Sequence, residues 1–127
     1  MGRESVQTAK APQAIGPYNQ AIKVNGVIYT AGQIPIDPAT GNFVEGGIRE
    51  QTRQVLRNLE AVLQAAGSSL NSVVKATVFL KNMSDFTAMN EVYGEFLGTV
   101  KPARSTVAMT ELPRGALIEI DLIAAVD

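Results

Sequence analysis

Residues 117–126 constrain the fold more than any other stretch, because their apolar side chains alternate along the chain. A period of two is typical of a β-strand with one buried face. The apolar residues that would share this face are Ile118, Ile120, Leu122, Ala124 and Val126. The other face begins with Glu119 and Asp121, which would lie roughly 7 Å apart at a rise of ~3.3 Å per residue. This face therefore begins with two carboxylates and ends with apolar side chains. Such a face is too apolar to be fully exposed to solvent and too charged to be buried in a closed core.

A second strand is expected just before this one, over residues 103–109. Its two faces would carry Arg104, Thr106 and Ala108 on one side and Ser105, Val107 and Met109 on the other. Residues 112–115, Leu-Pro-Arg-Gly, are typical of a turn between the two strands. Charged residues are unusual in strands that otherwise look buried, so Arg104 and Glu119 indicate a functional site. We expect the two side chains on the same sheet face.

The N-terminal third is expected to form a β-hairpin over residues 20–24 and 27–34. Asn25-Gly26 lies between these runs and is a strong signal for a type I′ turn. Tyr18 would begin the first strand. Gly32 interrupts the second, and a strand glycine marks either a close approach to the backbone or simple packing.

Apolar stripes at helical spacing predict two helices, over residues 48–66 and 86–97, each ended by a glycine. Ser84 or Asp85 would cap the second helix. Residues 73–81 alternate and predict a strand between the helices. Asn90 borders the second apolar stripe, so its amide needs a partner, either the backbone or a site residue. The element order predicts one α+β domain over residues 1–127, with both helices on one face of a mixed sheet.

Composition excludes several kinds of site. The chain has 127 residues, no cysteine, no histidine and a net charge of −1. A thiol nucleophile, an imidazole base and a Cys/His-ligated metal are therefore excluded, and the scattered basic residues give no footprint for nucleic acid. Because no apolar run approaches a membrane span and the N-terminus lacks a signal-peptide core, we expect a cytoplasmic protein that does not bind membranes.

The sheet face that the helices leave uncovered is expected to remain half apolar. Such a face predicts self-association, because large exposed apolar patches usually mark interfaces. If about three copies close around these faces, polar residues at the strand edges would form clefts between subunits, where small-molecule sites are common.

Six segments carry a recognisable combination of motifs. They are residues 15–21 (IGPYNQA), 29–38 (YTAGQIPIDP), 74–80 (VKATVFL), 85–93 (DFTAMNEVY), 102–105 (PARS) and 112–120 (LPRGALIEI). Together, over about residues 11–125, they resemble the RidA (YjgF) family of enamine/imine deaminases. The resemblance implies a homotrimer of the chorismate-mutase-like fold with sites between subunits. It also implies hydrolysis of 2-iminobutanoate and 2-iminopropanoate to the 2-oxo acid and ammonia, with no cofactor and no metal.

The resemblance also implies roles for individual residues. Arg104 would clamp the substrate carboxylate with two parallel hydrogen bonds, although a structural ion pair is the alternative. Glu119 would contact the imine end of the substrate and act on the attacking water as a general base. Gly32 would offer its backbone N–H to the substrate, and Tyr18 would line the pocket. The residues expected at the edges of this pocket are Ala31, Asn90 and Thr106.

Two positions depart from the family pattern. Ala31 stands where a serine is frequent, which removes a hydroxyl near the substrate, and Thr106 stands where a cysteine is frequent. The Ala31 change would lower activity or shift substrate preference, so a non-catalytic member that binds 2-oxo acids is an alternative. An endoribonuclease or translation inhibitor is a weaker alternative, because the chain has no histidine pair, metal-carboxylate cluster or basic stripe.

Overall fold

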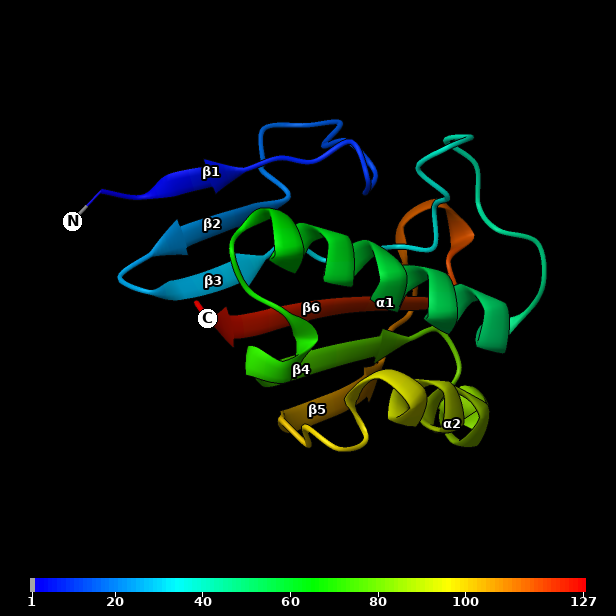
Figure 1. Cartoon of the computed structure of the whole chain (residues 1–127). Helices are drawn as coiled ribbons and strands as arrows, with labels where there is room; N and C mark the ends of the chain where they lie inside the picture. The colour runs from blue at the N-terminus through cyan, green and yellow to red at the C-terminus, as the bar shows by residue number, and fades with distance from the viewer. Residues whose placement is uncertain (1) are drawn as a thin grey trace.

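The alternating C-terminal stretch forms strand β6 (Ile118–Ala125), which lies inside a six-stranded sheet (Figure 1). The computed structural model describes residues 2–127. The remaining strands are β1 (Glu4–Val6), β2 (Ala21–Val24), β3 (Val27–Thr30), β4 (Val73–Leu80) and β5 (Ala103–Ala108). Their order is β1-β2-β3-β6-β4-β5, and only β4 and β5 pair in parallel. β6 therefore has neighbours on both sides, as its buried apolar face requires.

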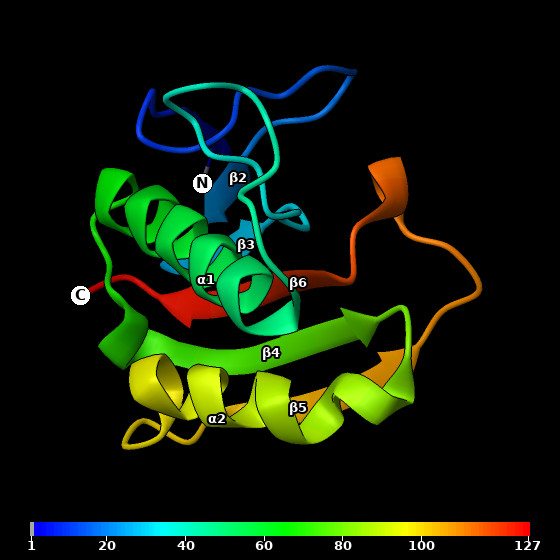
Figure 2. The same cartoon turned by 90° about the vertical axis from the view of Figure 1, so that its right-hand side faces the viewer.

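Two helices cover one face of this sheet, α1 (Ile48–Ala65) and α2 (Phe86–Leu97) (Figures 1 and 2). The core fills the layer between them and the sheet. Its largest fully buried side chains include Leu56, Leu59 and Leu63 of α1, Met89 and Leu97 of α2, and Ile118, Ile120 and Leu122 of β6. Within residues 2–127, no helix combines the length and the apolar character that crossing a bilayer demands.

Most predicted elements are confirmed, with differences at their ends. The Asn25-Gly26 turn joins β2 and β3 with positive φ at both residues, 52° and 74°, as a type I′ turn needs. Tyr18, predicted to begin a strand, instead lies in a loop, where its N–H donates to the Gly16 carbonyl at 2.8 Å. Strand β1 was not predicted, since three residues with one buried side chain carry almost no alternation.

Helix capping also differs from the expectation. Asp85 occupies the position before α2, but neither it nor Ser84 makes a side-chain capping hydrogen bond. A short 3₁₀ turn, Met83–Asp85, leads directly into the helix instead, and the Asp85 N–H donates to the Asn82 carbonyl at 3.1 Å. Asp85 is therefore the N-cap residue, as one of the two predicted alternatives, but the capping hydrogen bond expected from its side chain is not formed.

The two C-terminal strands are not neighbours, because β4 lies between them. In the parallel β4–β5 pair Arg104 lies beside Ala76, a fully buried residue on the helix-covered face. Glu119 pairs with Phe79, which belongs to the uncovered face. The prediction that Arg104 and Glu119 share a sheet face was wrong: they lie on opposite faces.

Gln20 fixes the irregular N-terminal segment against the sheet. Its side chain is 2% exposed. Its Oε1 accepts from the Thr8 N–H at 2.7 Å, and its Nε2 donates to the carbonyls of Thr8, Ala11 and Pro12 at 3.1, 3.2 and 2.7 Å. One buried amide thus satisfies backbone groups that no strand partner reaches.

We therefore predict that Gln20→Leu destabilises the protein by about 1–3 kcal/mol, the cost of leaving buried polar groups without partners. Urea unfolding at one fixed protein concentration measures this free energy. Gln64→Leu, the same change at an exposed position of α1, serves as the control. Equal stability of the two variants would show that Gln20 does not anchor the segment.

Candidate functional site

Arg104 is held on the helix-covered face by groups that leave most of its hydrogen-bond donors unused. Its Nη1 donates to Asn90 Oδ1 at 2.7 Å. Its guanidinium carbon lies 4.6 Å from the ring centre of Tyr93 and 5.5 Å from that of Phe86, both within cation–π range. Both ion pairs within residues 2–127 involve other arginines, so Arg104 has no carboxylate partner there. A guanidinium has five N–H donors, so this one is oriented and still able to bind an anion.

The partner of Asn90 is therefore a candidate site residue, not the backbone. Asn90 lies on α2 between Phe86 and Tyr93, so the three side chains form one platform beneath Arg104. Phe86 and Tyr93 belong to the apolar stripe that predicted the helix over residues 86–97, and from the sequence both were expected only in the core. Their spacing of four and three residues from Asn90 was the signal that they share its face of the helix.

Two buried hydroxyls near Arg104 lack partners. Among residues 2–127, Tyr93 Oη and Thr106 Oγ1 are buried with no hydrogen bond. Burial raises the pKa of Tyr93, and the positive charge of Arg104 opposes this rise. A shallow hollow opens beside them, lined by Asn90, Tyr93, Gly94, Leu97, Gly98, Lys101, Pro102 and Arg104. Arg104, Asn90 and Thr106 are thus brought together as one half of the predicted site.

Glu119 forms the centre of a second group on the uncovered face. A Cβ added to Gly32 would lie 2.8 Å from Glu119 Cδ and closer still to Oε2. No side chain larger than hydrogen fits there without moving the carboxylate, so the close-approach interpretation of Gly32 is confirmed. Gly32 also lines a pocket with Tyr18, and Tyr18 lines a shallower hollow with Ala31. The structure therefore places Gly32 directly against Glu119, and it groups Tyr18 with Gly32 in one pocket and with Ala31 in the other.

Burial perturbs the two carboxylates of β6. It raises the pKa of Glu119, and the nearby negative charge of Asp121 raises it further. Burial likewise raises the pKa of Asp121, while a hydrogen bond from Thr77 and the charge of Lys75 oppose the rise. No positive charge comparable to Lys75 lowers the pKa of Glu119. Its surroundings favour either a proton or a cationic ligand.

The two halves of the predicted site do not meet within one chain. Arg104 lies on the helix-covered face of edge strand β5, whereas Glu119 lies on the uncovered face of β6, with β4 between the two strands. No three His, Cys, Asp or Glu side chains of residues 2–127 lie close enough to hold a metal ion. One chain therefore presents an anion-binding half and a carboxylate half on separate surfaces.

The raised pKa of Glu119 predicts a pH-dependent effect of Glu119→Gln on stability. Because folding raises this pKa above its ordinary value of 4.5, the folded wild type binds a proton more tightly than the unfolded chain. The stability that Glu119 contributes is present below pH 4.5 and is lost as pH rises through the folded pKa. Glu119→Gln removes this loss, so the variant gains stability relative to wild type between pH 4 and pH 7.

Denaturant unfolding at both pH values, at one protein concentration, measures this difference. Glu111→Gln, the same change at an exposed residue, is the control. A difference between Glu119→Gln and wild type that stays constant with pH would contradict the assigned burial of Glu119.

Comparison with known proteins identifies the family. Residues 8–126 match the family described as Endoribonuclease L-PSP. A RutC family protein of Pyrococcus abyssi is 56% identical, with 98% of each chain covered. The 2-iminobutanoate/2-iminopropanoate deaminase of Mus musculus is 46% identical, with 96% of this chain and 90% of the relative covered. The solved structure of YyfA, a Rid family protein of Yersinia pestis, is 49% identical with a TM-score of 0.95, and covers 98% of this chain and 100% of its own.

These matches run over nearly the whole chain and agree with the segments that resembled the RidA family in the sequence. The six-stranded sheet with two helices is the fold of the matching structures. The chain belongs to the Endoribonuclease L-PSP family, the RidA/YjgF family.

Proposed function

We propose that the protein hydrolyses small 2-imino acids to 2-oxo acids and ammonia, at sites formed between two copies of the chain. The observation that carries the proposal is the separation of Arg104 and Glu119 onto opposite faces of one sheet. The two residues suit two ends of one substrate, a carboxylate and a cationic iminium. The name of the mouse relative supports this substrate class.

Arg104 is the carboxylate-binding group in this proposal. The Tyr93 ring and the Asn90 amide hold its guanidinium in one orientation, which lowers the entropic cost of binding. A planar guanidinium binds a carboxylate through two parallel hydrogen bonds, whereas the ammonium of lysine is a point charge. The backbone N–H of Gly32 in the second copy would complete the carboxylate site, while Tyr18 and Ala31 there and Asn90 and Thr106 beside Arg104 border the substrate.

Glu119 acts on the imine end. Its carboxylate favours the protonated iminium, which is the more electrophilic form, and takes a proton from water as the water oxygen bonds to the imine carbon. The product of this step is a neutral carbinolamine. Glu119 then returns the proton to nitrogen, and the C–N bond breaks as the oxygen lone pair forms the carbonyl. The hydroxyl proton passes to Glu119 and from there to the departing ammonia. The net reaction consumes one iminium and one water and yields one 2-oxo acid and one ammonium ion.

The uncovered face supports the assembly on which this mechanism depends. Tyr29 is 46% exposed and Val107 is 41% exposed on this face, beside the partly buried Phe79 and Ile123. Apolar side chains exposed together are stabilised by burial against another surface. We propose a homotrimer, in which this face turns inward and brings Glu119 of one copy beside Arg104 of the next.

Two other functions compete with this one. Ala31 has no hydroxyl where a substrate contact is expected, which favours a protein that binds 2-oxo acids without catalysis. The family description names an endoribonuclease, but a net charge of −1 and the absence of histidine from the sequence give this activity less support. Imine hydrolysis is tested by trapping enzymatically generated 2-iminobutanoate with semicarbazide. Unchanged trapping in the presence of the protein, with 2-oxobutanoate still bound, would favour the non-catalytic function.

A mixing experiment tests the shared site. We expect Arg104→Lys to weaken 2-oxo-acid binding by about 1.5–3 kcal/mol, and Glu119→Gln to lower turnover with binding largely kept. Assembled together in equal amounts, the two impaired variants leave roughly a quarter of the sites with both native residues, so the mixture should be more active than either variant alone. Each variant assembled alone is the control. No recovery in mixed assemblies of confirmed composition would contradict a site between copies.

Gly32→Ala tests the contact between the glycine and the catalytic carboxylate. The added methyl group occupies the space of Glu119 Cδ and Oε2, so the carboxylate must move while the backbone conformation stays accessible to alanine. Because small displacements of a catalytic group have large effects, turnover should fall by about 100-fold. Gly47→Ala, where an added Cβ meets nothing within 4 Å and which lines neither the pocket at Gly32 nor the hollows beside Tyr18 and Arg104, is the matched control. Full turnover in Gly32→Ala would show that Glu119 is not the reacting carboxylate.

A further inference from the structure

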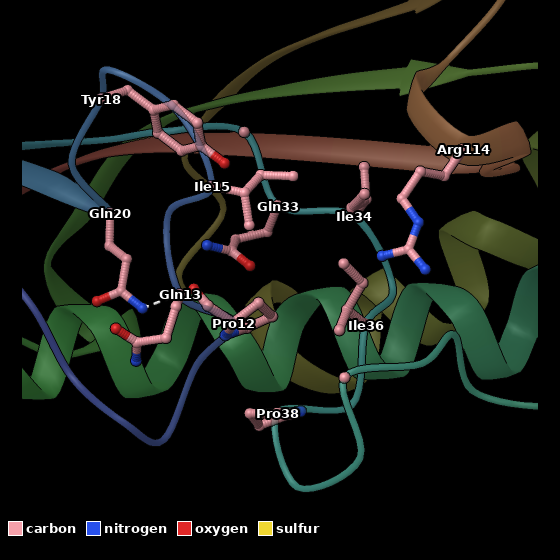
Figure 3. Close-up of a pocket in the computed structure, with 12 residues that line it drawn as sticks. Pro12, Gln13, Ile15, Tyr18, Gln20, Gln33, Ile34, Ile36, Pro38 and Arg114 are labelled. Atoms are coloured by element: carbon pink, nitrogen blue, oxygen red, sulfur yellow. Dashed lines mark hydrogen bonds between the residues drawn. The ribbon is translucent and has the colours of Figure 1, made fainter.

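A separate pocket built by a single chain lies at the end of the sheet, between the N-terminal segment and the loop that follows β3 (Figure 3). Its volume is about 280 Å³, near the lower limit of small-molecule sites. Much of its wall is apolar, and the residues responsible are Pro12, Ile15, Ile34, Ile36 and Pro38. The pocket shares Tyr18 and Gly32 with the carboxylate half of the proposed site but includes neither Glu119 nor Arg104.

The Gln33 amide faces this pocket and has no protein hydrogen-bond partner among residues 2–127. Gln33 is 6% exposed, and its backbone is fixed by hydrogen bonds with Ile120 in both directions, at 2.9 and 3.2 Å. Its side chain makes no hydrogen bond within residues 2–127 and points into the pocket in Figure 3. Gln20, which lines the same pocket, instead satisfies its amide with the N-terminal backbone. An amide that faces a pocket and has no protein partner is free to donate to a ligand there.

Arg114 supplies a positive charge on the opposite side of the pocket. Its guanidinium points toward Ile34 and Ile36 in Figure 3 and lies 5.2 Å from the ring centre of Phe43. Both ion pairs within residues 2–127 involve other arginines. Arg114 also has a φ of 57°, a conformation that is unfavourable for an arginine and natural for a glycine. The turn thus presents a charged side chain to the pocket at a cost in backbone energy.

We infer that this pocket binds a small amphipathic carboxylate. The carboxylate accepts hydrogen bonds from the Gln33 amide and the Arg114 guanidinium, and its hydrocarbon part lies against the three isoleucines and two prolines of the wall. A carboxylate matches both polar groups, since each can donate and an anion balances the arginine. An apolar body matches the remaining wall. Every lining residue comes from one chain, and neither Arg104 nor Glu119 is among them, so binding does not require the two residues that the proposed catalytic site combines from two copies.

Calorimetric titration with 3-phenylpropanoate tests the inference, with neutral 3-phenylpropanamide as the matched probe. We expect one carboxylate bound per chain and at least tenfold weaker binding of the amide. Arg114→Gln and Gln33→Met should each weaken carboxylate binding, the first by about tenfold or more. Arg57→Gln, the same arginine change at an exposed position of α1, should leave it unchanged.

Arg104→Lys separates this site from the proposed catalytic site. Binding of 3-phenylpropanoate should survive Arg104→Lys, and hydrolysis of 2-iminobutanoate should survive Arg114→Gln. Loss of probe binding in Arg104→Lys would place the probe in the catalytic site and overturn the inference. Equal binding of the acid and the amide, or unchanged binding in Arg114→Gln, would also overturn it. Absence of imine hydrolysis in wild type would contradict the proposed function alone.

Discussion

The half-buried carboxylate of Glu119, held against Gly32 on a sheet face without helices, is the constraint on which the rest of the site depends. Burial and the neighbouring Asp121 both disfavour its charge. Any surface that covers this face removes more water and increases the penalty, unless it also brings a positive group. The face therefore favours a cationic ligand or a partner surface with a positive charge, in addition to apolar contacts.

Arg104 carries the opposite charge, and it too has no oppositely charged partner within residues 2–127. Its charge lies over aromatic rings and beside an amide, groups that orient a guanidinium without neutralising it. A carboxylate from the same chain would have stabilised the fold equally well but would have occupied the donors that an anionic ligand needs. The edge position of β5 leaves this arginine beside an open hollow.

Local pattern predicted the elements well and their arrangement less well. Alternation in residues 118–126 predicted a strand with a buried face because the core selects those side chains directly. It carried no information on which strand lies beside it, and β4 lies between β5 and β6. The sheet face of Arg104 is set by its pairing beside Ala76, so the alternation within β5 alone could not assign it. The sequence could not predict either that the Gln33 amide lacks a protein partner, since this depends on the groups that surround it in the folded chain.

The separation of Arg104 and Glu119 also bears on the symmetry of any assembly that unites them. A two-fold dimer uses one self-complementary patch on both copies, so both residues would have to lie on one continuous surface. The sheet itself stands between them, with β4 separating their strands. Contact between two different surfaces is heterologous, and it forms a closed ring only if the rotation between copies returns to the start. The homotrimer proposed for this protein would be a closed ring of this heterologous kind.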